Sequence, residues 1–194
     1  FAAGFVTSGP GATNLLSGVC CAWYDSIPCL FITGQVGEIH IKDKRRIRQL
    51  GFQETDTVSI FKSVTKLSIQ IRNANNIGYI LDKCFYIAKS GRPGPVHIDI
   101  PYNIQRTIID TKNLKSFRFE QKNFEKKYDQ INKKSIKFVK PLCLDIAKSK
   151  KPLFLIGGGV KLSKQEKKVL SICKTLKIPF FTTCMTQDIP NASE

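Results

Sequence analysis

The segment 7–14, Thr-Ser-Gly-Pro-Gly-Ala-Thr-Asn, constrains this chain more than any other. It follows an apolar run, residues 1–6, and it leads into a predicted helix over residues 14–22. Its two glycines permit a sharp turn around a fixed proline, so backbone N–H groups can face outward where the helix begins. Such a loop can hold a ligand by backbone contacts, although an ordinary strand-to-helix turn has the same spacing.

Strand and helix patterns alternate beyond this loop. The apolar run 29–33 suits a strand that is buried on both faces. Asn73 is a suitable N-cap for a helix that ends at Lys89. The repeated strand–helix–strand pattern predicts an α/β fold with a parallel sheet covered by helices. We also expect a short helix over 57–64 and strands over 67–71 and 96–100.

A second, smaller α/β unit is predicted after a charged stretch. Residues 110–132 lack a clean hydrophobic period, so we interpret 110–134 as an interdomain linker between a first domain, 1–109, and a second, 135–194. In the second domain an amphipathic helix is expected to begin near Pro141, because proline is tolerated only in the first turn. We further expect strands over 153–156 and 178–183, and a helix to Leu176 that begins with a Ser163–Glu166 capping box.

Charge and cysteine content exclude several classes of function. The net charge is +16, but residues 111–140 hold ten Lys and Arg against three Asp and Glu, which is typical of a solvated linker and helix face. We therefore expect no nucleic-acid partner, with a basic nucleotide- or RNA-binding module as the alternative. The seven cysteines form no CxxC pair, so we expect no metal site and a cytoplasmic or other reducing compartment. No apolar run approaches the roughly 20 residues of a membrane span.

Several short blocks in fixed order identify a family. The blocks are Asp25–Pro28, Ile32–Val36, Gly51–Thr55, Ser63–Lys66, Ser90–Val96 and Asp99–Pro101. Together with segment 7–14, they make the chain resemble the thiamine-diphosphate (ThDP) enzymes, and most closely the acetolactate synthase group. A later run, 152–159, resembles the first strand of the central, Rossmann-like α/β domain of that family.

The resemblance implies roles for residues of the first domain. This domain would bind the pyrimidine half of ThDP, with Pro10, Gly11 and Asn14 facing the cofactor. Gln35 ends a buried strand, where ligands gather in parallel sheets, and its carboxamide could contact the substrate or cap local backbone. The resemblance favours the substrate role, and it places three further residues near the substrate: Phe52, Gln53 and Lys66. His97, inside an apolar strand pattern, is interpreted as a core or sheet-face histidine.

The glycine triplet 157–159 follows the first strand of the second domain. Glycine lets a ligand approach the backbone closely. The acetolactate synthase resemblance implies FAD here, with Thr183 and Met185 nearby, but other members of the family leave this groove empty or bind another nucleotide there.

Two elements of ThDP chemistry are missing from the sequence. The family places a catalytic glutamate upstream of segment 7–14, and its Mg²⁺ ligands follow a Gly-Asp-Gly motif that does not occur here. We therefore expect a part of a longer enzyme that is inactive alone, with the metal ligands outside these residues. The parent enzyme would decarboxylate a small 2-oxo acid and transfer the product to an acceptor, as a homodimer or tetramer. The alternatives are a ThDP-dependent oxidase, simple decarboxylase or acyl-CoA lyase.

Overall fold

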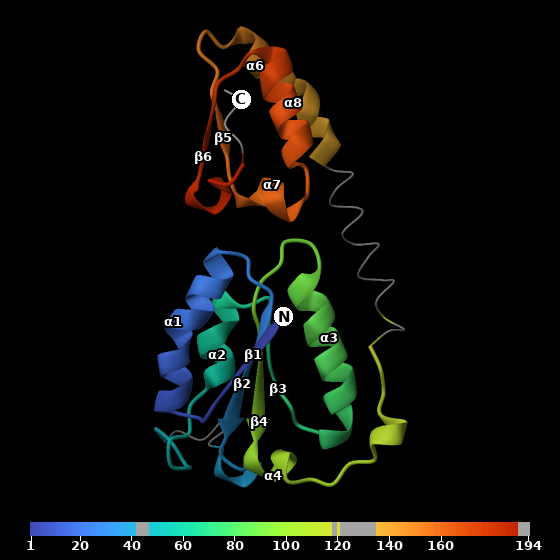
Figure 1. The fold of residues 1–194 in the computed structure, drawn as a ribbon. Helices are drawn as coiled ribbons and strands as arrows, with labels where there is room; N and C mark the ends of the chain where they lie inside the picture. Colours follow the sequence, from blue (N-terminus) through green and yellow to red (C-terminus); the bar gives the residue numbers. More distant parts are fainter. Residues whose placement is uncertain (42–46, 118–119, 121–134, 190–194) are drawn as a thin grey trace. The chain divides into compact units, whose positions relative to one another are not determined.

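The computed structural model describes residues 1–41, 47–117, 120 and 135–189 (Figure 1). The chain divides into two compact units, one within residues 1–126 and one within residues 127–194. Within the described residues, no helix is long and apolar enough to cross a membrane.

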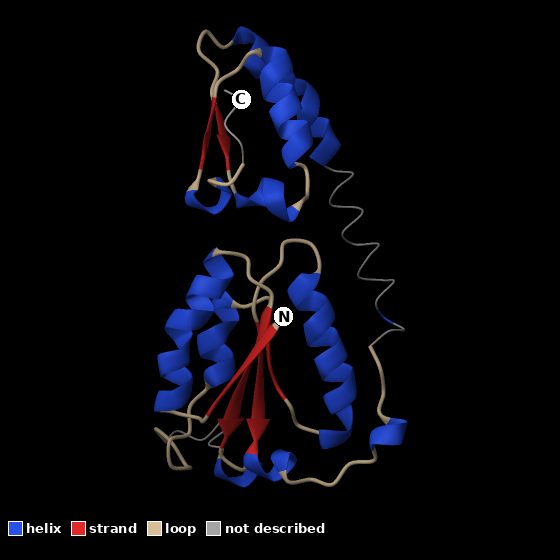
Figure 2. Ribbon diagram, viewed as in Figure 1, coloured by secondary structure: helices blue, strands red, loops and turns tan. Residues whose placement is uncertain are grey.

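The first unit is built on a parallel sheet of four strands in the order β1-β2-β4-β3. Figure 2 shows helices on both faces of this sheet, which confirms the predicted α/β fold. In Figure 1, α1 and α2 lie on one side of the strands and α3 lies on the other. The strands are β1 (Ala2–Val6), β2 (Cys29–Gln35), β3 (Leu67–Gln70) and β4 (Val96–Pro101), and the α-helices are α1 (Pro10–Tyr24), α2 (Thr57–Phe61), α3 (Ile77–Lys89) and α4 (Tyr102–Gln105).

Local sequence explains where these helices begin. Pro10 is the first residue of α1, a position at which its missing N–H and fixed φ suit a helix. The predicted helix 73–89 begins with a 3₁₀ turn, Ala74–Asn76, before α3. The Asn73 side chain accepts a hydrogen bond from the Asn75 N–H at 3.0 Å, so the predicted N-cap is confirmed for that turn.

The two faces of the sheet differ in chemistry. Toward α3 the core is apolar, as the alternation of strand side chains requires. Toward α1 and α2 an apolar cluster around Val19 and Phe61 adjoins a group of buried polar side chains. His97 belongs to this polar group and is fully buried, which confirms its interpretation as a sheet-face residue. The other buried polar residues on this face are Thr33, Gln35, Thr57 and Asp99.

Residues 114–117 lie against α3. The Phe117 ring is 1% exposed and packs 5.6 Å from the ring of Tyr79 and 5.7 Å from that of Tyr86. Ser116 donates a 2.7 Å hydrogen bond to Asp82. Residues 110–117 form the first part of the predicted linker 110–134, whose remainder lies outside the described residues except for Glu120. The boundaries of the linker and of the two domains stay predictions.

The second unit pairs two short parallel strands, β5 (Phe154–Ile156) and β6 (Phe180–Thr182). Three α-helices accompany them: α6 (Val139–Lys148), α7 (Gly158–Leu162) and α8 (Glu166–Leu176). Pro141 is the third residue of α6, so the helix begins two residues before the predicted point and keeps the proline in its first turn.

The predicted capping box of α8 is wrong. The N-cap residue is Gln165, and no side chain caps the helix there. Ser163 instead follows the last residue of α7, and its hydroxyl donates to the Val160 carbonyl at 2.9 Å. The sequence pattern could not show this, because the glycine triplet gives no sign of the short helix α7 that uses Ser163 at its end.

Candidate functional site

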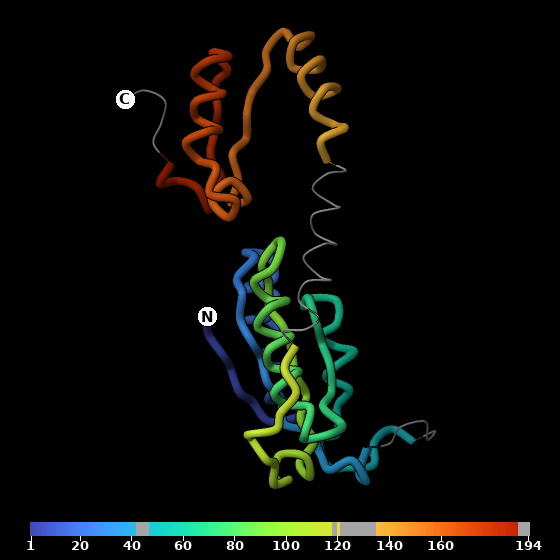
Figure 3. Tube along the Cα trace, turned by 90° about the vertical axis from the view of Figure 1, so that its right-hand side faces the viewer, coloured from blue at the N-terminus to red at the C-terminus, as the bar shows by residue number. Residues whose placement is uncertain are grey.

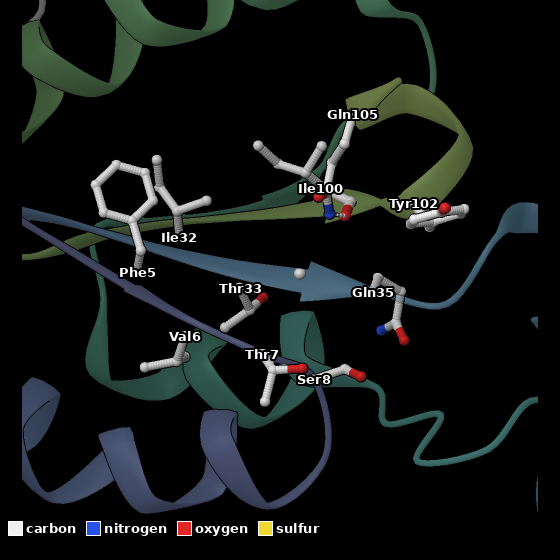
Figure 4. Close-up of a pocket in the computed structure, with 11 residues that line it drawn as sticks. Phe5, Val6, Thr7, Ser8, Ile32, Thr33, Gln35, Ile100, Tyr102 and Gln105 are labelled. Atoms are coloured by element: carbon white, nitrogen blue, oxygen red, sulfur yellow. Dashed lines mark hydrogen bonds between the residues drawn. The ribbon is translucent and has the colours of Figure 1, made fainter. Parts of the chain in front are cut away.

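The candidate site lies at the carboxyl edge of the first sheet. In parallel sheets ligands bind outside this edge, where the strands feed into loops. Here a pocket of about 610 Å³ lies over the ends of β1, β2 and β4 (Figure 4). Figure 3 shows the chain on both sides of residues 42–46 extending outward from this end. The pocket is lined by Phe5, Val6, Thr7, Ser8, Ile32, Thr33, Gly34, Gln35, Ile100, Tyr102 and Gln105.

The loop from β1 to α1 depends on Gly9. This residue has φ 63° and ψ −125°, a conformation that L side chains rarely adopt. A Cβ atom at Gly9 would also lie 2.8 Å from Cβ of Gln53, so residues 51–55 pack directly on the loop. The Thr13 N–H then donates to the Gly9 carbonyl at 3.1 Å and starts α1. Glycine therefore serves both the turn and the contact between two loops.

The predicted ThDP-binding residues lie together within the first five residues of α1. Pro10 and Asn14 are exposed, and Gly11 is half-buried. A Cβ atom at Gly11 would lie 2.7 Å from Cγ2 of Thr7, so this glycine is also needed for the packing of the loop itself. The structure thus brings these three residues to one exposed turn beside the pocket residue Ser8.

The carboxamide of Gln35 is held by the protein. Its Nε2 donates to the Thr55 carbonyl at 2.6 Å and to Oδ2 of Asp99 at 3.2 Å, and its Oε1 accepts from the Val36 N–H at 3.0 Å. Both donor hydrogens are therefore engaged, and only one lone pair of Oε1 stays available for a further bond. The substrate role of Gln35 stays a prediction, and the geometry restricts that role to accepting a hydrogen bond.

Asp99 is the centre of the buried polar group. Its carboxylate is fully buried and accepts bonds from Thr33 Oγ1 at 2.5 Å, Gln70 Nε2 at 2.8 Å and Gln35 Nε2 at 3.2 Å. A buried carboxylate is costly unless it is hydrogen-bonded, and these three donors satisfy it. Asp99 thereby joins side chains from β2 and β3 to its own strand.

His97 lies beside Asp99 on the same face of β4. Its Nε2 is 2.9 Å from Thr33 Oγ1, and its Nδ1 is 2.8 Å from Ser68 Oγ. Its ring also packs 4.5 Å from the ring of Phe61. Burial lowers the pKa of His97 to about 4, and the negative charge of Asp99 opposes this shift only in part. The ring is therefore neutral at pH 7, as a core residue.

Phe52 and Gln53 lie in the loop that packs on Gly9. The Phe52 side chain is 83% exposed, so this aromatic is not part of the core. Gln53 has φ 61°, an uncommon conformation for a residue other than glycine, and its carbonyl accepts from Thr55 Oγ1 at 3.3 Å. The structure thus brings Gln53 to the candidate site, and Phe52 lies exposed next to it.

The structure does not bring Lys66 to this site. Lys66 directly precedes β3, at the amino edge of the sheet, whereas Gln35 ends β2 at the carboxyl edge. Its Nζ donates to the carbonyls of Ile87 and Ser90 at the end of α3. Burial lowers the pKa of Lys66 to about 8. Within this unit Lys66 therefore caps a helix rather than lining the pocket.

The predicted flavin residues also lie close together. Gly157 follows β5, and the Thr183 N–H after β6 donates to the Ile156 carbonyl at 2.9 Å. A Cβ atom at Gly158 would lie 3.3 Å from Cβ of Met185, and one at Gly157 would lie 3.8 Å from Thr183. At Gly159 an added Cβ would meet no described atom within 4 Å. The backbone is therefore open at Gly157 and Gly159, whereas Gly158 lies close to Met185.

Sequence reasoning missed Asp99, Thr33, Tyr102 and Gln105 as site residues. Asp99 carried a usable signal, since a carboxylate inside a buried strand needs several donors around it. Tyr102 and Gln105 gave no usable signal, because they lie in α4, which has only four residues and so shows no hydrophobic period. No group of three metal-binding side chains occurs among the residues that the structure describes.

Two family models match the chain. Residues 1–60 match the N-terminal TPP binding domain of thiamine pyrophosphate enzymes, and residues 139–194 match their central domain. Thiamine pyrophosphate is another name for ThDP.

Curated relatives cover nearly the whole chain. It is 35% identical to the acetolactate synthase large subunit of Lactococcus lactis, over 93% of this chain and 29% of that protein. It is 36% identical to a probable acetolactate synthase large subunit of Methanocaldococcus jannaschii, over 96% of this chain and 31% of that protein. The corresponding subunit of Cyanidium caldarium is 35% identical, over 92% of this chain and 29% of that protein. The chain thus spans about 30% of the length of these relatives. Since the N-terminal and central domain models match in the order of the chain, it belongs to the thiamine pyrophosphate enzymes.

Proposed function

We propose that this chain belongs to an enzyme that decarboxylates a small 2-oxo acid and joins the product to an acceptor, as acetolactate synthases do. The observation that carries the proposal is the pair of contacting loops at the carboxyl edge of the sheet. Both loops, 7–14 and 51–55, are blocks of the acetolactate synthase resemblance, and they meet where Gln53 packs on Gly9. The identity of about 35% to acetolactate synthase large subunits supports the same reaction.

The first turn of α1 would hold the pyrimidine half of ThDP. Its residues Pro10 and Asn14 are exposed, and Gly9 bends the chain so that the helix starts at the pocket rim. When bound, ThDP supplies the carbon nucleophile that attacks the 2-oxo acid. Gln35, Phe52 and Gln53 would border the approach of the substrate. Mg²⁺ would be held by ligands outside this chain.

The assembly would be a homodimer or tetramer in a reducing compartment such as the cytoplasm. In enzymes of this family the two halves of one cofactor site come from different subunits, and this chain carries features of the pyrimidine half only. Light scattering of the full-length protein tests the assembly: a monomer that is fully active would contradict it.

FAD is a separate proposal, for the glycine triplet beside Thr183 and Met185. The open backbone at Gly157 and Gly159 supports it, because a bulky cofactor needs such close approach. The full-length protein should then be yellow as purified, and Gly157→Val should remove the colour while the protein stays folded. Gly157 is preferred to Gly158 because its added Cβ meets Thr183 at an ordinary 3.8 Å, whereas at Gly158 it would press on Met185 at 3.3 Å. A colourless protein whose activity does not change when FAD is added would contradict the flavin proposal.

Product analysis tests the reaction. The full-length protein, given pyruvate, ThDP and Mg²⁺, should release carbon dioxide and form acetolactate. Acetaldehyde as the sole organic product would indicate a simple decarboxylase instead. Acetate formed with consumption of an electron acceptor would indicate an oxidase. Salt-sensitive RNA binding without turnover of any 2-oxo acid would overturn the proposal.

A further inference from the structure

A chain of contacts connects the buried carboxylate of Asp99 to the loop at Gly9. Asp99 accepts from Gln35, and Gln35 donates to the Thr55 carbonyl. The Thr55 hydroxyl donates to the Gln53 carbonyl, and Gln53 packs against Gly9. The buried centre of the sheet is thus linked to the exposed loop in four steps.

The hydrogen-bonding character of Asp99 indicates the orientation of the Gln35 amide group. An ionised carboxylate only accepts hydrogen bonds, and three donors already surround this one. The end of the Gln35 side chain that faces Asp99 must therefore be the NH₂ group. In that orientation Oε1 meets the Val36 N–H, and the second Nε2 hydrogen meets the Thr55 carbonyl at 2.6 Å.

The reversed amide would fail at both of its other contacts. Its oxygen would face the Thr55 carbonyl, which is also an acceptor, and its NH₂ group would face the Val36 N–H, which is also a donor. Asp99 and the two backbone groups thus favour the same orientation of the amide. Asparagine at position 99 would carry no charge, so its bond to Gln35 would be weaker. The negative charge of Asp99 therefore strengthens the contact through which Gln35 holds the Thr55 carbonyl.

We propose that Asp99 is a positioning residue that acts through Gln35 to hold residues 53–55 against Gly9 of segment 7–14. Asp99 itself is fully buried and does not line the pocket. Its effect on cofactor binding rests on the proposed function, whereas its effect on the loop does not.

Hydrogen–deuterium exchange of the full-length protein tests the loop. The Glu54 N–H is bonded to the Gly51 carbonyl and the Thr57 N–H to the Thr55 carbonyl, so a peptide over 51–57 reports whether the loop is held. Asp99→Asn and Gln35→Met should each raise exchange in this peptide at least ~tenfold, the effect of losing one buried hydrogen bond to a charged or polar partner. Thr33→Val, which removes the 2.5 Å bond to Asp99, should raise it about threefold.

Two comparisons separate positioning from general loosening. If Asp99 acts through Gln35, the double variant Asp99→Asn/Gln35→Met should exchange like Gln35→Met alone. The matched control is Ser68→Ala, which breaks bonds to Val58 and His97 in the same buried group but none in the path to Thr55, and it should leave the peptide within twofold of wild type. Additive effects in the double variant, or equal loosening by Ser68→Ala, would overturn the proposal. Unchanged exchange in Thr33→Val would also overturn the proposal. This test holds even if Asp99→Asn does not fold.

Calorimetry with ThDP and Mg²⁺ gives the second readout. If both proposals hold, Asp99→Asn should weaken ThDP binding in parallel with the loosened loop. A loosened loop with no ThDP binding in any variant or in wild type would contradict the proposed function alone. Firm ThDP binding by Asp99→Asn with an unchanged loop would contradict the positioning role alone.

Discussion

Replacing Gly9 by alanine should destabilise the first unit, whereas the same change at Gly18 should stabilise it. Gly9 has φ 63° and ψ −125°, and an added Cβ would lie 2.8 Å from Cβ of Gln53. Gly18 lies within α1, and an added Cβ there would meet no described atom within 4 Å. The two substitutions are chemically identical, so only the local geometry distinguishes them.

The magnitudes follow from the two geometries. At Gly9 the strained backbone costs about 1–3 kcal/mol, and the overlap with Gln53 adds about 1–3 kcal/mol unless the loop shifts. The lower entropy of the unfolded chain offsets about 0.4–1 kcal/mol. We therefore expect Gly9→Ala to lower the free energy of unfolding by about 1–5 kcal/mol. At Gly18, replacing a helical glycine should raise it by about 0.5–1 kcal/mol.

Urea unfolding measures both effects. Trp23 is the only tryptophan in residues 1–194 and lies near the end of α1, so its fluorescence reports the first unit. The comparison requires that each variant and wild type show the same dependence of the free energy of unfolding on urea concentration. A changed dependence would indicate a different unfolded or folded state. A Gly9→Ala protein within 0.5 kcal/mol of wild type, or a Gly18→Ala protein as destabilised as Gly9→Ala, would refute the reasoning.

Two further predictions concern buried titratable groups. The pKa of His97 is about 4 in the folded chain against 6.5 for an unperturbed histidine, so the unfolded state binds the extra proton between these values and stability should fall by about 2 kcal/mol from pH 7 to pH 5. His97→Gln should remove most of this loss and the exposed His40→Gln should keep it; a loss that persists in His97→Gln would assign it to other groups. Lys66→Met should lower the free energy of unfolding by about 1–2 kcal/mol, because the carbonyls of Ile87 and Ser90 lose their donor. Lys62→Met, on an exposed neighbouring turn, is its control, and equal effects in urea unfolding would argue against the capping role.

Sequence alone predicted the elements of the first unit well, because its signals are local. Apolar runs located β2 and β4, and Asn73 marked the turn before α3. The turn at Gly9 also followed from its own residues, but α1 begins at Pro10, four residues before the predicted start at residue 14, because proline suits the first helical position.

The partners of the site residues could not be predicted, because they come from the register of strands that are distant in sequence. Gln35 meets Asp99 across 64 residues, so a pattern at the strand end gave no sign that its amide is already engaged. The position of Lys66 could not be predicted for a related reason: a matching block gives a residue's identity but not the edge of the sheet on which it lies. The capping box at Ser163 failed because the preceding helix α7 uses that serine first.

The central claim is that the start of α1 holds ThDP. Calorimetric measurement of ThDP binding to the full-length protein, in the presence of Mg²⁺, tests it most directly. Asn14 is exposed one turn after Pro10 in α1, where the cofactor is expected, and Asn14→Ala should weaken ThDP binding about tenfold, or 1.4 kcal/mol. The neighbouring Thr13→Ala is the control, because its hydroxyl turns back to the carbonyls of Gly9 and Pro10 and should not reach the cofactor. We expect saturable binding by wild type and Thr13→Ala, and weakened binding by Asn14→Ala. Equal affinity in all three proteins, or no binding by wild type, would contradict the account.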